Sequence, residues 1–206
     1  IGVPSSIQMS LRSLMGVVLM AIVAKYGTYA VAAYGVGLRI MMLVLMPAFG
    51  LAMAAATLVG QNLGAQEPER AHLSAWAATR FTMLIMGTVG IIFFLLAPDL
   101  IRLFNTNPQV VAIGTDYLRT TSFGYIFIAL GVVLGRSLNG AGDTISPMVI
   151  TFISLWCLQI PLALILPGSL HLGIAGVWWA ILISTIVNGT ITTGWFQKGR
   201  WKLKEI

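Results

Sequence analysis

The sequence predicts an all-α integral membrane protein, a bundle of six transmembrane helices formed by 206 residues. The first observation is composition: 58% of the residues are hydrophobic and only 9% are charged, with a mean hydropathy of +0.92. A soluble domain carries about 25% charged residues, so this chain has too few to cover a surface that faces water. The second observation is a series of long apolar runs. Each is about as long as the ~20 residues that cross a bilayer as a helix.

Six apolar runs, separated by short polar breaks, are expected to cross the membrane as one lobe over residues 1–206. Backbone polar groups in lipid must be satisfied within the segment, so each run is expected to be a helix. Strands of a membrane barrel would be about ten residues long and would alternate in polarity, which these runs do not. The approximate spans are 4–24, 31–63, 76–97, 111–135, 147–166 and 173–196.

Basic residues assign the breaks and the tail to the two sides of the membrane. The odd-numbered connections hold Lys25 and Arg102. The even-numbered connections and the tail hold Arg70, Arg136, Lys198, Arg200, Lys202 and Lys204. The positive-inside rule therefore predicts a multi-pass protein of the inner (cytoplasmic) membrane with both ends cytoplasmic. The net charge of +6 does not indicate nucleic-acid binding, because the cationic residues form no basic stripe.

The second span is too long for a simple crossing. Its roughly 33 residues would extend ~50 Å as a helix, against about 30 Å of hydrocarbon. Pro47 in its middle has no N–H, so the carbonyl of Leu43 loses its partner, and Gly50 adds local freedom. Transporters use such bent helices for gating, whereas a static kink that serves packing is an equal alternative. Pro161 is a second, weaker case.

Polar side chains within the apolar runs are the candidates for a substrate cavity. A charge at membrane depth costs at least ~2.5–3.5 kcal/mol and usually faces a cavity or a partner. Arg12 lies near the middle of the first span and Arg39 about a third of the way into the second. Pairing with carbonyl groups is the competing role for both arginines. The amides of Gln159 and Asn188 are expected either to bond neighbouring helices or to line a polar path.

None of the acidic residues falls in the middle of an apolar run. Asp116 is the deepest, and Arg119, three residues later on the same helix face, is expected to form an ion pair with it. A role for Asp116 in cation coupling is the weaker alternative. Asp143 is expected to support the turn before the fifth span, where Ser146 would cap the helix. The acidic residues are Glu67, Glu69, Asp99, Asp116, Asp143 and Glu205.

No set of catalytic or metal-binding residues emerges from the sequence. His72 and His171 both fall in loops, on opposite sides of the membrane under this topology. The single cysteine, Cys157, can form neither an internal disulfide nor a metal site. The stretch "NGAGDT" lacks the GxxxxGK[ST] spacing of a phosphate loop. We therefore expect no enzymatic activity, no cofactor and no metal ion. An intramembrane enzyme and a non-transporting membrane subunit are the alternatives from other functional classes.

Two stretches carry a family resemblance. They are "AAYGVGLRIMMLVLMPAFGLAMAAATLVGQNLGA" at 32–65 and "LGRSLNGAGDTISPMVI" at 134–150. With "GVP" at 2–4 and "KGRWK" at 198–202, they resemble the MATE family, the multidrug and toxic compound extrusion transporters. The motif residues are Gly60, Gln61, Asn62, Gly64, Asn139, Gly140, Gly142 and Asp143.

The resemblance implies a twelve-helix transporter built from two six-helix lobes, of which this chain is most similar to the C-terminal one. The first residue is not methionine, and the N-terminal lobe is expected to lie outside this chain. The implied function is a proton- or sodium-coupled antiporter that exports small organic compounds, often cationic or aromatic, by alternating access. The alternative is a lipid-linked oligosaccharide flippase of the same superfamily, which would need a large, strongly cationic cavity.

The resemblance also bears on ion coupling. Sodium-coupled members of one branch use two carboxylates in this lobe, at positions that fall near Arg12 and Ile128 here. Neither position is acidic in this sequence. Coupling is therefore expected to reside in the N-terminal lobe.

Overall fold

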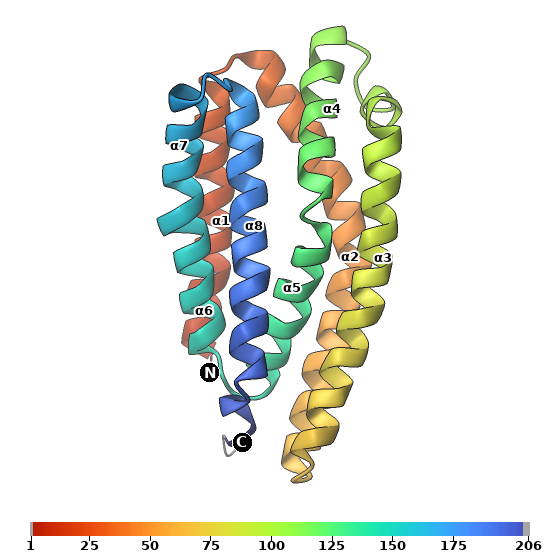
Figure 1. Ribbon diagram of the computed structural model, residues 1–206, viewed down its shortest axis with the longest axis vertical. Helices are drawn as coiled ribbons and strands as arrows, with labels where there is room; N and C mark the ends of the chain where they lie inside the picture. Colours follow the sequence, from red (N-terminus) through yellow and green to blue (C-terminus); the bar gives the residue numbers. More distant parts are fainter. Residues whose placement is uncertain (1, 204–206) are drawn as a thin grey trace.

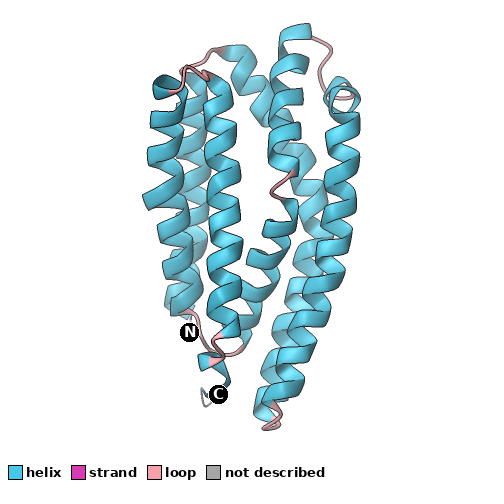
Figure 2. Ribbon diagram, in the orientation of Figure 1, coloured by secondary structure: helices cyan, strands magenta, loops and turns pink. Residues whose placement is uncertain are grey.

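The computed structural model describes residues 2–203, which form helices and contain no strand. The helices pack side by side, and both ends of the chain lie at the same end of the bundle (Figure 1). Short loops connect them (Figure 2). Within the described residues, five crossings are long and apolar enough to span a membrane, and a bent helix pair brings the number to six when it is counted as one span. The fold is therefore the all-α membrane bundle that the sequence predicts, with five to six apolar spans. Lys204 and Glu205 lie outside the described residues.

The first two helices are α1, Gly2–Ala24, and α2, Thr28–Gly64. At 37 residues, α2 would extend about 55 Å, well beyond one crossing. The helix is continuous through Pro47. Figure 1 shows that it runs obliquely behind α4 in its first half and alongside α3 in its second half. Pro47 lies inside this helix and removes one of its backbone hydrogen bonds.

The third helix, α3, covers Pro68–Arg102 and is longer than the expected 76–97. It tolerates Pro98 near its C-terminal end and packs along α2 over much of its length. The next helix, α4, covers Pro108–Ser122, and Asn107 caps its N-terminus. The Asn107 side chain accepts hydrogen bonds from the backbone N–H groups of the second and third helical residues, at 2.9 and 3.4 Å.

The fourth span is broken, contrary to the single run expected over 111–135. Helix α4 ends at Ser122, and α5, Tyr125–Gly140, continues at an angle of 56°. The hydroxyl groups of Thr121 and Ser122 both donate to carbonyls one turn back, at 2.8 and 2.5 Å. Such bonds compete with the backbone pattern and bend helices. No proline marks the break, and its position could not be read from hydropathy.

The fifth span is also irregular. It consists of α6, Ile145–Phe152, a π-helical segment η1, Ile153–Gln159, and α7, Ile160–Ser169. The π-helical turns lie directly before Pro161, where the sequence predicts an irregularity. Proline removes the N–H that would bond one turn back, and wider turns accommodate the freed carbonyl.

The last span is α8, Ile174–Gln197, followed by a short 3-10 helix η2, Arg200–Leu203. Trp201 in η2 is buried against Phe196 at 4.7 Å between ring centroids, and its indole N–H donates to the Phe196 carbonyl at 2.8 Å. His72 at the start of α3 stacks on Phe196 at 5.7 Å. Lys202 also forms an ion pair with Glu69 at 2.8 Å. These contacts fix the C-terminal segment to α3.

The helices form two groups. Helices α1, α6, α7 and α8 lie on one side, α2 and α3 lie on the other, and α5 contacts both groups (Figure 1). A buried aromatic cluster joins α2, α4 and α8, with the Tyr34 ring 5.6 Å from Tyr117 and 5.7 Å from Trp178. Gly37 faces Tyr117 and leaves no room for a Cβ atom. This packing fixes the end of the bundle that lies far from the chain termini.

The two motif stretches meet where α2 crosses α5. A Cβ atom on Gly140 would overlap the backbone of Ala56, and one on Gly60 would lie 3.1 Å from the Gly140 carbonyl oxygen. Glycine at both positions therefore lets the two helix backbones approach closely. The motif glycines Gly60 and Gly140 have a packing role.

Candidate functional site

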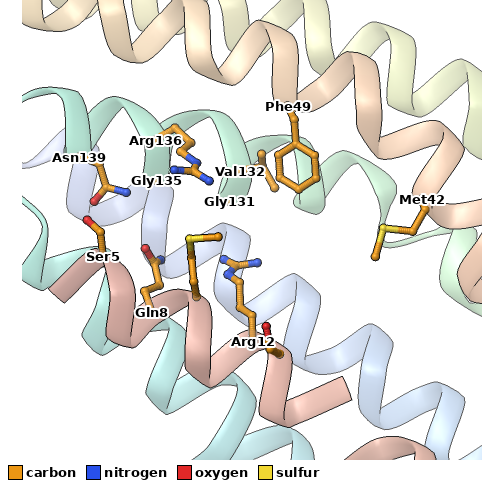
Figure 3. Close-up of a pocket in the computed structure, with 12 residues that line it drawn as sticks. Ser5, Gln8, Arg12, Met42, Phe49, Gly131, Val132, Gly135, Arg136 and Asn139 are labelled. Carbon is orange, nitrogen blue, oxygen red and sulfur yellow. The ribbon is translucent and has the colours of Figure 1, made fainter. Parts of the chain in front are cut away.

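A cavity of about 350 Å³ lies between α1, α2 and α5 (Figure 3). We refer to it as the α1–α2–α5 cavity. Helix α1 contributes mostly polar side chains, and α2 contributes Met42 and Phe49. Helix α5 contributes three small or medium residues, one arginine and one asparagine: Gly131, Val132, Gly135, Arg136 and Asn139. Gly135 keeps the space open, because a Cβ atom there would meet nothing within 4 Å. Lipid-facing helices seldom expose so many polar groups at one place.

Two arginines face each other across this cavity. Arg12 extends from α1 and Arg136 extends from α5 into the same space (Figure 3). Both guanidinium groups are directed into the space between α1 and α5, where their like charges repel each other (Figure 3). Within residues 2–203, neither side chain has an ion-pair or hydrogen-bond partner. The cavity therefore carries concentrated positive charge.

Polar contacts hold the α1 side of the cavity in place. The Gln8 amide donates to the Thr151 hydroxyl at 2.9 Å and to the Pro147 carbonyl at 3.1 Å, both in α6. The Trp156 indole N–H in η1 donates to the Leu11 carbonyl at 3.3 Å. These bonds cross from α1 to the fifth span, so they fix the part of α1 from which Arg12 extends.

Of the four polar residues expected to line a cavity, one lines the α1–α2–α5 cavity and three lie elsewhere. Arg12 lines the α1–α2–α5 cavity. Arg39 is exposed on α2, away from the residues that line it. Gln159 is only 4% exposed and lies within η1. Asn188 in α8 lies behind the cavity, with its amide oxygen against Gly131, where a Cβ atom would come within 2.7 Å.

Sequence reasoning missed Arg136 as a cavity residue. Its charge was assigned to a connection, because the fourth apolar run was expected to end at 135. The break after Ser122 allows α5 to continue to Gly140, so Arg136 is in a helix rather than a loop. Its spacing from Val132 and Asn139, four residues before and three after, was the available signal: it places all three residues on one helix face, and all three line the cavity.

Asp116 is exposed on α4. The expected ion pair with Arg119 is wrong: among the described residues, none joins these two side chains. Arg119 instead donates to the Phe94 carbonyl at 3.4 Å and lies 5.8 Å from the centre of the Phe94 ring. Its side chain therefore turns toward α3, where a carbonyl acceptor and an aromatic face are both available.

The two candidate gating residues lie on α2. Pro47 lies between Met42 and Phe49, the two side chains that α2 contributes to the cavity. Gly50 is exposed, and a Cβ atom there would meet nothing within 4 Å. Bending of α2 at Pro47 would thus move the Met42 side chain relative to the Phe49 side chain.

The remaining motif residues organise helix ends. Asn62 donates to the Leu58 carbonyl at 2.8 Å, Gln61 is exposed, and Gly64 is the last residue of α2. Gly142 has a φ of 76° in the turn between α5 and α6, a conformation that favours glycine.

Asp143 supports the start of the fifth span, as expected, although Thr144 is the capping position of α6. Its carboxylate accepts from the Ser146 hydroxyl at 2.7 Å and from the Trp195 indole N–H at 3.3 Å. Asp143 therefore joins α6 to α8. Within residues 2–203, no group of three His, Cys, Asp or Glu side chains could hold a metal ion.

Comparison with known proteins identifies the family. The family model MatE matches residues 4–165. Together with the six-span bundle and the paired motifs, this match shows that the chain belongs to the MatE family, the MATE transporters that its motifs resemble. This is a family of membrane transporters and not of enzymes, as the sequence predicts.

The relatives named below are longer than this chain. The "Probable multidrug resistance protein NorM" of Thermotoga maritima is 31% identical over all of this chain and 44% of its own length. The "FAD transporter" of Shewanella oneidensis is 28% identical over 90% of this chain and 41% of its own length. A solved outward-facing multidrug resistance MATE family transporter shares the fold, with a TM-score of 0.86 at 24% identity, over 94% of this chain and 43% of that one. The chain thus spans less than half the length of these relatives.

Proposed function

We propose that this chain forms one lobe of a cation-coupled antiporter that exports small organic compounds across the inner (cytoplasmic) membrane by alternating access. The observation that carries the proposal is the α1–α2–α5 cavity on a MatE-family fold. Its apolar lining is incompletely covered, with Met42 59% exposed and Phe49 42% exposed. A second lobe, the proposed partner, would cover these side chains and complete the cavity, in keeping with the greater length of the relatives.

Alternating access requires a part of the lobe that can change shape. Pro47 interrupts the backbone hydrogen-bond pattern of α2 between two cavity side chains, Met42 and Phe49. We propose that bending near Pro47 and Gly50 changes the exposure of the cavity. The driving proton or sodium ion must bind one conformation better than the other, since equal binding would shift nothing.

We propose that the residues that bind the driving ion lie in the other lobe. Within residues 2–203, no acidic side chain lines the α1–α2–α5 cavity. Asp116 is the remaining candidate in this lobe, and it lies exposed on α4. The substitution Asp116→Asn in the protein that carries this chain should leave export intact. Abolished export with normal expression would move coupling into this lobe.

A lipid-linked oligosaccharide flippase is not favoured. The two relatives named above are a "Probable multidrug resistance protein" and an "FAD transporter", names that favour the transport of small organic compounds. FAD carries phosphate groups, so one relative handles an anionic compound.

The proposed function is tested by transport in proteoliposomes. Ethidium and norfloxacin would be followed with a proton gradient, with a sodium gradient and with neither. Export that requires one gradient supports the antiporter. Equal movement of both compounds without any gradient would contradict it.

A further inference from the structure

The strongest unassigned feature is the pair of arginines in the α1–α2–α5 cavity. Arg12 is exposed and Arg136 partly exposed toward this cavity. A charged side chain at membrane depth is costly, so such groups usually pair with another charge or a backbone carbonyl, or line the path of a substrate. Within residues 2–203, no acidic residue lines the cavity, and neither Arg12 nor Arg136 has an ion-pair partner. The nearest candidate by sequence, Asp143, is already bonded to Ser146 and Trp195.

We propose that Arg12 and Arg136 form a binding site for an oxyanion group, a phosphate or a carboxylate, on the compound that occupies this cavity. This rests on the proposed function, in which the cavity holds the exported compound. Each guanidinium presents a planar set of donors that matches two oxygens of a phosphate or carboxylate. Because the arginines extend from opposite sides, one oxyanion between them relieves their mutual repulsion.

The rest of the cavity suits an organic body attached to that anion. Phe49 and Met42 on α2 and Met9 on α1 supply apolar surface in the same cavity. Asn139 lies at one end of the cavity, beside Ser5 (Figure 3). A compound that carries only positive charge, such as ethidium, would be repelled by this part of the lobe, so norfloxacin, which carries a carboxylate, is the transport probe that fits this site.

A matched pair of probes isolates the contribution of the anion. Riboflavin and flavin mononucleotide (FMN) share one aromatic ring system and differ by a phosphate. Binding to the purified protein that carries this chain would be followed by flavin fluorescence in nanodiscs of phosphatidylcholine. FMN should bind at least about tenfold more tightly than riboflavin, as expected for charge-assisted hydrogen bonds.

Substitutions then test whether the Arg12 and Arg136 side chains cause the tighter binding of FMN. Arg12→Gln and Arg136→Gln should each reduce FMN affinity about tenfold and leave riboflavin affinity unchanged. Arg12→Lys keeps the charge but not the planar fork, and it should give an intermediate value. Arg80→Gln, which removes an exposed arginine from α3, is the matched control and should change neither affinity. Unchanged thermal unfolding of each variant would show that the fold is intact.

Two sources of phosphate are distinguished by lipid composition. If added phosphatidylglycerol lowers FMN binding in the wild type but not in Arg136→Gln, the natural occupant is a lipid headgroup. If it has no effect, the site serves soluble anions. Equal binding of FMN and riboflavin, or a preference that survives both Gln substitutions, overturns the oxyanion site. Gradient-driven export with no FMN preference would overturn this inference alone, whereas FMN binding without export would overturn the proposed function alone.

Discussion

Gly140 in α5 lies so close to Ala56 in α2 that it has no room for a side chain. The two residues belong to separate motif stretches, and their contact holds α2 against the helix that carries Arg136. The position of the α5 residues that line the cavity therefore depends on close contact between the backbones of α2 and α5, which only glycine at position 140 permits.

The first prediction follows from this contact. Gly140→Ala would insert a methyl group against the Ala56 backbone and is expected to destabilise the protein by about 1–3 kcal/mol, as overpacking does. Thermal unfolding in detergent measures the change. Gly194→Ala is the matched control, because Gly194 also lies in a helix but a Cβ atom there meets nothing within 4 Å. Equal unfolding temperatures for the two variants would contradict the packing role of Gly140.

The second prediction concerns the C-terminal segment. Trp201→Ala removes a side chain that is 1% exposed and stacks on Phe196, so a loss of about 3–5 kcal/mol is expected. Trp179→Ala removes an indole that is 45% exposed and serves as the control. Proteolysis at the C-terminal end would report the release of η2 from α3. Similar behaviour of both variants would show that the Trp201 contacts do not hold this segment.

The third prediction tests the anchoring of α1. Gln8 bonds the Thr151 hydroxyl, and a double-mutant cycle with Gln8→Ala and Thr151→Val isolates that bond from the loss of other contacts. Side-chain hydrogen bonds between membrane helices average about 0.6 kcal/mol, and a coupling of that size is expected here. Additive effects of the two substitutions would mean that the bond does not stabilise α1.

The fourth prediction concerns Pro47. Pro47→Ala restores an N–H donor for the Leu43 carbonyl and should straighten α2. If bending at this point exposes the cavity alternately, the substitution should slow export several-fold while thermal stability is kept or raised. Export at the wild-type rate would indicate that the kink serves packing, which is the alternative that the sequence leaves open.

Hydropathy predicts the crossings because each helix must satisfy its backbone in lipid over a fixed thickness. The break between α4 and α5 was not predictable in this way, because it depends on how Thr121 and Ser122 bond their own helix. The motif stretches could be recognised from sequence, but the contact of Gly60 with Gly140 needs the crossing geometry of α2 and α5.

The candidate site was less predictable than the fold. A charge within an apolar run directed attention to Arg12, and the structure places it at the cavity. Arg136 lies near the end of a run, where a cation can also be explained by topology. The structure shows that the Arg136 side chain extends toward α1 and so lines the same α1–α2–α5 cavity as Arg12.

The central claim is that the α1–α2–α5 cavity holds the exported compound, and filling it tests this most directly. Gly135→Leu places a larger side chain in open space within the cavity, so the protein should fold normally. Gly194→Leu, at an open position on α8 outside the cavity, is the control. Gradient-driven export from proteoliposomes should be lost in Gly135→Leu and kept in Gly194→Leu. Export at the wild-type rate by a folded Gly135→Leu protein would contradict the account.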